Sequence, residues 1–154
     1  MVVVRAGERW LGLFAEDVAC VVANGARPTP LPHAPAAVLG IVSVRGRILT
    51  LLDAPALLGE RRADSETAAP PPFILALRGE EQLALAVESP GRLCETSLAE
   101  ILPPRDATEN ISRGTFQDGE RAVIILDVTR LFALAVEGMS WRRRKRALQD
   151  EEKK

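Results

Sequence analysis

Short apolar runs, broken repeatedly by glycine and proline, restrict the fold of this chain more than any other feature of its sequence. Each run is at most seven residues long and rich in Val, Ile and Leu. Runs of this length are typical of β-strands and too short for most helices. We therefore predict strands over Val2–Val4, Trp10–Ala15, Val18–Ala23, Val38–Val44, Ile48–Leu52, Phe73–Leu77, Leu83–Val87 and Ala122–Leu126.

Turn signals lie between several of these runs. Arg45-Gly46 separates two of them, and Gly46 can adopt the positive φ that a two-residue hairpin turn needs. Gly79 to Glu81 and Asp118-Gly119 mark two further turns. The pattern therefore predicts antiparallel hairpins.

Few helices are expected, and they should be short. Ser97 followed by Glu100 has the form of a capping box. Asp53 and Asp127 each follow an apolar run and precede a Leu-rich stretch, so each is predicted to be a helix N-cap. A basic helix is predicted at the end of the chain, from about Ser140 to Gln149.

The chain also has the pattern of a duplication. Three segments of the first half recur 71 to 74 positions later: Leu11–Glu16 as Leu83–Glu88, Leu31-Pro32 as Leu102-Pro103, and Leu51–Asp53 as Ile125–Asp127. The charged, then proline-rich segment Glu60–Pro72 separates the halves. Each half holds about five short strands, which is the content of a small barrel too short to be stable alone. We therefore predict two barrels that share a core.

No constellation for catalysis is visible in the sequence. It lacks the glycine-rich phosphate-binding motifs and the HExxH and CxxC patterns of metal and redox sites. The single histidine, His33, lies among prolines and is interpreted as an exposed loop residue. Asp53 and Asp127 hold the same place in the repeat, so they are interpreted as caps and not as an acid–base pair. We predict a protein that is not an enzyme and needs no cofactor or metal.

Cysteine usage and hydropathy suggest a compartment. Cys20 and Cys94 lie in apolar segments without metal-ligand spacing, and both are predicted to be buried free thiols. No run approaches the roughly 20 apolar residues of a spanning helix, and Arg5 and Glu8 interrupt any signal-peptide core. We therefore expect a cytoplasmic protein without membrane insertion.

A dense basic run stands out against the net charge of −1. It consists of Arg142, Arg143, Arg144, Lys145 and Arg146, next to Trp141. Such a run could follow the phosphates of nucleic acid or of lipid headgroups, with Trp141 stacking on a base. Acidic residues follow at once, so the favoured interpretation is a solvated tail helix in which Arg146 pairs with Asp150. A nucleic-acid-binding barrel protein that uses this tail is the alternative.

One segment is specific enough to suggest a family. Leu31–Asp53 combines a proline-flanked entry, the run Gly40-Ile-Val-Ser-Val-Arg-Gly46, an apolar strand and a closing aspartate. It resembles the CheW family of chemotaxis coupling proteins, which has a proline-flanked loop, a GVxNLRG motif, a strand and an Asp-Leu pair. The resemblance continues at Leu83–Glu88, Ile101–Pro104 and Glu120–Phe132.

The resemblance implies a fold and its boundaries. The fold would be all-β, with one or two short helices, and built of two interlocked five-stranded SH3-like β-barrels. A CheW-like domain would span residues 1–136, with subdomains at about 9–60 and 72–134. Residues 137–154 would then form a basic tail.

The resemblance also implies a function. Proteins of this family are non-catalytic adaptors that couple the cytoplasmic tip of a chemoreceptor to the regulatory domain of a CheA-type histidine kinase. The receptor contact of the family carries over to Arg45, with Gly40, Val44 and Gly46 shaping the surface around it. Turn geometry alone is the competing explanation for Gly40 and Gly46.

Overall fold

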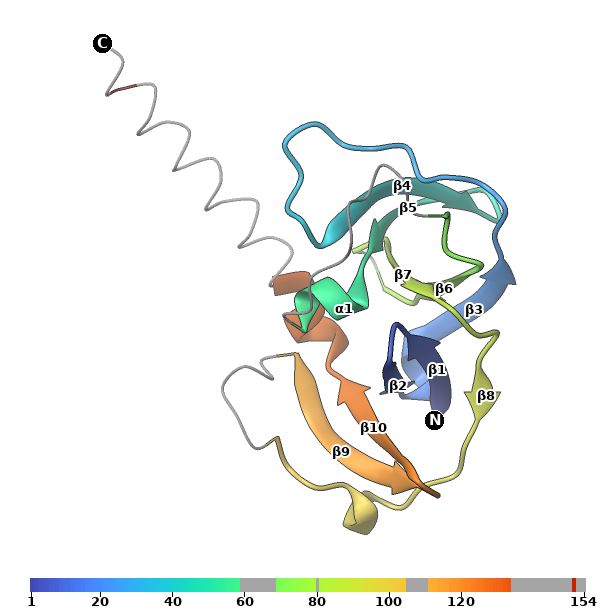
Figure 1. Ribbon diagram of the computed structural model, residues 1–154, viewed down its shortest axis with the longest axis vertical. Helices are drawn as coiled ribbons and strands as arrows, with labels where there is room; N and C mark the ends of the chain where they lie inside the picture. Colours follow the sequence, from blue (N-terminus) through green and yellow to red (C-terminus); the bar gives the residue numbers. More distant parts are fainter. Residues whose placement is uncertain (59–68, 80, 105–110, 134–150, 152–154) are drawn as a thin grey trace.

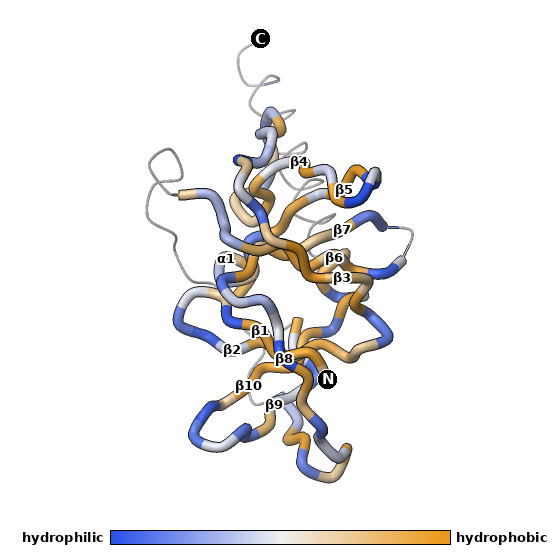
Figure 2. The backbone as a smooth tube through the Cα atoms, turned by 90° about the vertical axis from the view of Figure 1, so that its right-hand side faces the viewer, coloured by the Kyte–Doolittle hydropathy of each residue, from blue (hydrophilic) through white to orange (hydrophobic). Residues whose placement is uncertain are grey.

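The chain folds into two five-stranded sheets, one above the other in Figures 1 and 2. The computed structural model describes residues 1–58, 69–79, 81–104, 111–133 and 151. Sheet A has the order β8-β1-β2-β10-β9, and sheet B has the order β3-β6-β7-β5-β4. The strands of sheet A are β1 (Val2–Ala6), β2 (Arg9–Leu13), β8 (Arg92–Leu93), β9 (Ser112–Asp118) and β10 (Arg121–Leu126). Those of sheet B are β3 (Val18–Ala23), β4 (Val38–Val44), β5 (Arg47–Leu52), β6 (Phe73–Leu77) and β7 (Leu83–Val87).

Helices in the described residues are short. They are the single turn α1 (Ala54–Leu57), the 3-10 turns η1 (Ala15–Asp17) and η2 (Leu98–Glu100), and a helical segment at 128–133. All eight predicted strands are present, and the all-β prediction is confirmed. Strands β8 and β9 are additional. Sequence periodicity missed them because β8 has two residues and β9 is mostly polar.

The two sheets are built alike, which fits the duplication. In sheet A the hairpin β1–β2 pairs in parallel with β10 through β2, and in sheet B the hairpin β6–β7 pairs in parallel with β5 through β7. Each half of the chain therefore contributes a hairpin to the sheet that the other half completes. This exchange is what interlocks the two units.

Because of this exchange, each of the expected subdomain ranges, about 9–60 and 72–134, holds strands of both sheets. The first of these ranges holds β2 of sheet A together with β3, β4 and β5 of sheet B. The second holds β6 and β7 of sheet B together with β8, β9 and β10 of sheet A. The physical reason is the parallel pairing of β2 with β10 and of β7 with β5, which crosses the linker between the halves.

One edge strand of each sheet, β4 in sheet B and β9 in sheet A, also forms a short backbone bridge to a preceding segment. Thr29 pairs with Ile41 next to β4, and Leu102 pairs with Thr115 on β9, with N···O distances of 2.8 and 2.9 Å in both bridges. Gly40 lies beside the first bridge with φ +146°, and a Cβ there would collide with the carbonyl of Thr29. The chain's own backbone thus approaches Gly40 closely, which explains the glycine at this position.

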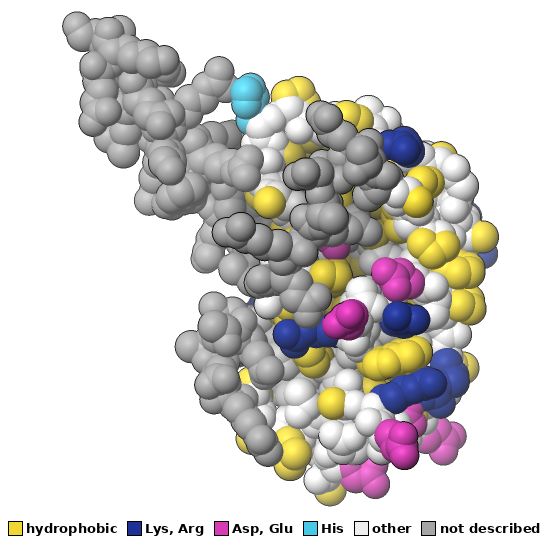
Figure 3. Space-filling view, in the orientation of Figure 1, with side chains coloured by type: hydrophobic (Ala, Val, Ile, Leu, Met, Phe, Trp, Pro, Cys, Tyr) yellow, Lys and Arg dark blue, Asp and Glu magenta, His cyan; other side chains and the backbone are white. Residues whose placement is uncertain are grey.

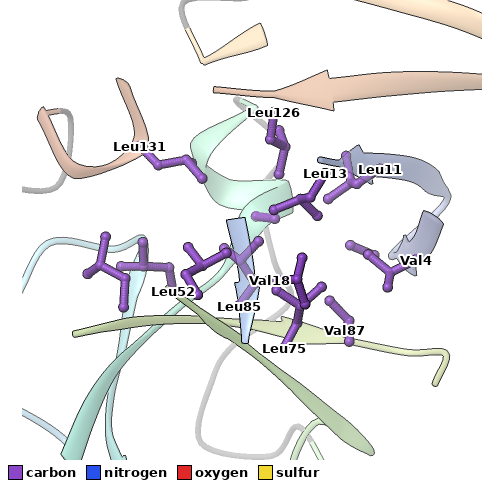
Figure 4. Close-up of a cluster of buried hydrophobic side chains, with 14 of the residues drawn as sticks. Val4, Leu11, Leu13, Val18, Leu52, Leu75, Leu85, Val87, Leu126 and Leu131 are labelled. Carbon is purple, nitrogen blue, oxygen red and sulfur yellow. The ribbon is translucent and has the colours of Figure 1, made fainter. Parts of the chain in front are cut away.

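The largest buried cluster lies between the two sheets. Figure 4 shows side chains from both sheets pointing toward one another, with Leu131 of the 128–133 helix at one side. The labelled members are Val4, Leu11, Leu13, Val18, Leu52, Leu75, Leu85, Val87, Leu126 and Leu131. Burying one such side chain is worth about 1.5–3 kcal/mol. A shared core of this size explains why neither half should be stable alone.

The predicted caps have mixed outcomes. Oδ1 of Asp127 accepts from the backbone N–H groups of Thr129 (3.1 Å) and Arg130 (3.3 Å), as an N-cap should. The side chain of Asp53 makes no cap hydrogen bond, and Pro55, at the second helical position, has no N–H to donate to it. Asp53 caps α1 only through its carbonyl, which accepts from Leu57 N–H at 3.2 Å.

The capping box is half confirmed. Oγ of Ser97 accepts from Ala99 N–H at 3.2 Å, but Glu100 accepts from the hydroxyl of Thr96 and does not reach back to Ser97. The predicted helix from Ser140 to Gln149 lies outside the described residues.

Candidate interaction site at the β4–β5 hairpin

The β4–β5 hairpin ends in the two-residue turn that the sequence predicts. Val44 pairs with Arg47, which leaves Arg45 and Gly46 as the turn. Both have positive φ, +49° at Arg45 and +79° at Gly46. Positive φ at both central positions is the signature of a type I′ turn, whose twist matches that of the flanking strands. The turn therefore presents Arg45 on a rigid hairpin.

Of the four predicted site residues, two are exposed and two are buried. Arg45 and Gly46 are exposed, and a Cβ at Gly46 would meet nothing within 4 Å. Val44 and Gly40 are buried. A partner can contact Arg45 and Gly46, whereas Val44 and Gly40 hold the hairpin in place from within.

Two further residues complete the exposed tip, and the sequence interpretation missed both. Ile48 is 63% exposed, and Arg47 donates to the carbonyl of Gly79 at 3.4 Å, which ties the hairpin to the neighbouring turn. Alternation along β5 could have found Ile48, because it lies on the opposite face from buried Leu49. The tip thus carries two guanidinium groups without an ion pair to any described residue, those of Arg45 and Arg47, and one exposed isoleucine.

Elsewhere on the surface, positively charged side chains often lie next to negatively charged ones. Figure 3 shows Arg side chains next to Asp and Glu over the lower half of the molecule. Arg5 pairs with Glu88 at 3.8 Å, and Arg92 pairs with Asp118. Exposed pairs of this kind contribute little to stability. The lower surface therefore offers no strong field of one sign.

The histidine and the two cysteines, whose side chains could be chemically reactive, have ordinary surroundings. His33 is exposed, as predicted. Cys20 and Cys94 are free, as predicted, but both are only partly buried, so the prediction of full burial was wrong. Each lies at the edge of a hydrophobic cluster. Among the described residues, no three His, Cys, Asp or Glu side chains are grouped for a metal ion.

One carboxyl group is electrostatically unusual. Burial raises the pKa of Asp17 above its ordinary value of 3.8, and nearby Arg113 partly opposes this shift. Asp17 lies in η1, where the chain crosses from sheet A to sheet B. Asp17 therefore lies at the junction between the two sheets.

Two sequence expectations concern features beyond this site. The basic residues 142–146 and Trp141 lie outside the described residues. Within the described part of the chain, no helix has the length and hydropathy to cross a bilayer.

The exchanged hairpins, the shared core and the bridged sheets define the class: a duplicated all-β domain of two intertwined five-stranded units. A family model described as "CheW-like domain" matches residues 1–136. The chain therefore belongs to the CheW-like domain family.

Individual relatives agree with this assignment. A chemotaxis protein CheW of Rhizobium meliloti (strain 1021) is 33% identical over 95 residues, which are 62% of this chain and 59% of that protein. A probable chemotaxis protein CheW of Rhizobium etli is 28% identical over 110 residues, 68% of this chain and 69% of that protein. The matched region thus spans about three fifths to two thirds of these relatives.

A solved structure supports the fold. The crystal structure of the scaffolding protein TtCheW from Thermoanaerobacter tengcongensis superposes with a TM-score of 0.66 at 24% identity, covering 82% of this chain and 87% of that one. The predicted fold of two interlocked units is confirmed by this likeness.

Proposed function

We propose that this protein is a non-catalytic adaptor of a bacterial chemosensory pathway, which couples a chemoreceptor to a CheA-type histidine kinase. The match of the CheW-like domain model to residues 1–136 is the observation that carries the proposal. This range includes every strand of both sheets. The names of the two rhizobial relatives point to the same pathway.

An adaptor of this kind acts by binding its two partner proteins. Arg45 is the residue we assign to the receptor contact, with Gly46 and Ile48 beside it. An arginine with a free guanidinium can bind carboxylates or carbonyls through its planar fork, and its stem can pack on apolar surface. Because a rigid type I′ turn holds Arg45, binding should cost little backbone ordering.

The competing proposal, nucleic-acid binding through residues 142–146, has no support from the family. The net charge of −1 also gives the whole chain no field that attracts phosphate. We therefore retain the adaptor function alone.

Pairwise titration tests the proposal. The full chain is titrated against the cytoplasmic tip of a chemoreceptor and against the regulatory domain of a CheA-type kinase, both from the same bacterium, by isothermal calorimetry. We expect saturable binding to each at micromolar concentrations, as is typical of transient assemblies. Lack of binding to both partners would refute the adaptor function.

A further inference from the structure

The tip of the β4–β5 hairpin, Arg45 to Ile48, projects beyond the strand that neighbours β5. Strand β5 pairs in parallel with β7 from Thr50 onward, where the N–H of Thr50 donates to the carbonyl of Gln82 at 2.8 Å. Within the described part of the chain, the tip therefore has no third strand beside it. Because a two-stranded hairpin alone is only marginally stable in water, another contact is needed to fix the tip in one position.

The turn at the tip is also conformationally strained. Arg45 has φ +49°, a left-handed conformation that residues with a Cβ rarely adopt. In sheet A the corresponding hairpin is β9–β10, and its turn has Gly119 at the first central position, with φ +64° and without this strain. Strained residues persist where the surrounding structure holds them, and they are frequent at functional sites. The arginine at this position therefore points to a function of its side chain.

Arg47 connects the tip to the neighbouring hairpin. Its Nη2 donates to the carbonyl of Gly79, in the turn between β6 and β7, at 3.4 Å. Gly79 has φ +127°, and the carboxylate of Glu81 occupies the space that a Cβ of Gly79 would need. A negative charge next to Gly79 favours the cation of Arg47 at the same place. Hydrogen bonding and charge thus both hold Arg47 on this turn.

The duplication repeats this arrangement in sheet A. Arg121 is the first residue of β10, as Arg47 is the first residue of β5. Its guanidinium carbon lies 4.1 Å from the centroid of the Trp10 ring on β2, a cation–π contact. Strand β10 pairs with β2 only from Val123 onward, so this contact also lies beyond the parallel pairing. An arginine at the same position therefore contacts the adjacent hairpin in both sheets, by different chemistry.

We propose that Arg47 is a positioning residue for Arg45. Its bond to Gly79 holds the projecting tip against the β6–β7 turn, so that the strained turn presents Arg45 to the receptor in one orientation. Without this bond the tip gains backbone freedom, and binding has to order it, which lowers the affinity. The inference rests on the proposed adaptor function for the receptor contact, whereas the contact between Arg47 and the turn can be tested without any partner.

Backbone motion tests that contact directly. The ¹H–¹⁵N heteronuclear NOE is measured by NMR on the full chain and on the variants Arg47→Ala and Arg47→Lys. Arg47→Ala should lower the value of the Gly46 amide, and Arg47→Lys, whose ammonium can also donate to a carbonyl, should restore at least half of the loss. The amide of Gly119, in the turn of sheet A, should not change. An unchanged Gly46 amide in Arg47→Ala would overturn the proposal.

Receptor binding separates positioning from direct contact. In calorimetric titration against the receptor tip, Arg47→Ala should bind about fivefold more weakly than wild type, the effect of one hydrogen bond, and Arg47→Lys should recover most of the affinity. In the background of Arg45→Ala, Arg47→Ala should have no further effect, because the residue that it positions is missing. An equal loss in both backgrounds would show that Arg47 contacts the receptor itself, and would contradict the proposal.

Arg121→Ala is the matched control, because it removes the equivalent contact from sheet A. Arg47→Ala and Arg121→Ala should both melt within about 3 °C of wild type, and only Arg47→Ala should weaken receptor binding. Equal weakening by both variants would mean that a general loss of stability is responsible, which would overturn the proposal. If wild type did not bind the receptor tip, the adaptor function would fail together with the receptor role of Arg47, while the NMR measurement would still decide whether Arg47 holds the tip.

Discussion

Gly40 and Gly114 are structural equivalents, 74 positions apart, and each lies against the carbonyl of a residue that forms a bridge to the edge strand of its sheet: Thr29 for Gly40 and Leu102 for Gly114. Their φ angles are +146° and +154°, a region that side chains with a Cβ rarely adopt. The same steric requirement for a residue without a Cβ therefore occurs once in each half of the chain. It is the most direct trace of the duplication in the backbone.

Replacement of either glycine should be costly. Gly40→Ala and Gly114→Ala each combine backbone strain with a collision against a carbonyl, so we expect each to lower the free energy of unfolding by about 2 kcal/mol or more. Gly25→Ala is the matched control, since Gly25 has open space around it and should stay within about 0.5 kcal/mol of wild type. Urea unfolding followed by circular dichroism measures all three. Normal stability of both Gly40→Ala and Gly114→Ala would contradict the closed-bridge geometry.

The raised pKa of Asp17 makes stability depend on pH. In the window that starts near 3.8 and extends to the higher folded-state pKa, the folded protein binds more protons than the unfolded chain, so stability falls as pH rises. Above that window the ionised carboxylate remains a constant destabilising contribution. Asp17→Asn removes both effects.

We therefore expect Asp17→Asn to gain stability relative to wild type as pH rises from 4 to 7. Arg113, Glu16 and Asp127 act on this carboxyl group, so the comparison is made at constant ionic strength. Urea unfolding of both proteins at several pH values gives the difference. A difference that does not change with pH would show that Asp17 titrates alike in the folded and unfolded states.

The chain end after Gly138 should be dispensable for folding. The family match ends at residue 136, and the largest buried cluster contains no described residue beyond Leu131. Truncation after Gly138 removes Trp141 and the run 142–146, and we expect the melting temperature to stay within about 2 °C of the full chain. A strongly lowered melting temperature in differential scanning calorimetry would make the tail part of the core.

Local patterns in the sequence could predict most elements but not their partners. The eight apolar runs are strands because their length and composition favour extended backbone, and Arg45-Gly46 is a turn because of its glycine. Membership of a hairpin in one sheet or the other depends on contacts far apart in the sequence, so the exchange of β1–β2 and β6–β7 was not predictable in this way. For this reason, each of the ranges 9–60 and 72–134 holds strands of both sheets.

The same limit applies to sites. Arg45 could be found because a family motif and a turn signal coincide on it. The pocket lined by Phe14, Leu98, Ile101, Pro103, Arg113 and Ile125 could not be found, because these residues come from distant segments and β9 has no hydrophobic periodicity. Ser112 is an example of a buried polar residue that hydrophobic periodicity does not predict. Its hydroxyl donates to the Gly114 carbonyl and accepts from the Gly114 N–H, each at 3.0 Å.

Loss of the Arg45 side chain should affect binding and not folding. Arg45 is exposed, so Arg45→Ala should change the free energy of unfolding by no more than about 0.5 kcal/mol. Binding of the receptor tip should weaken by about 2 kcal/mol, roughly thirtyfold. Arg121→Ala is the control, because Arg121 is also exposed and lies on β10 of sheet A, whereas the hairpin tip belongs to sheet B. Calorimetric titration of the three proteins measures the effect, and equal affinities would remove Arg45 from the site.

The central claim is that one chain couples two partners, and co-sedimentation tests it most directly. Receptor signalling fragments assembled on vesicles are mixed with the CheA-type kinase in the presence or absence of this protein, and the kinase in the pellet is quantified. We predict that the kinase sediments with receptor only when the protein is present, and that Arg45→Ala greatly reduces this fraction while Arg121→Ala does not. Equal sedimentation of the kinase with and without the protein would contradict the coupling function.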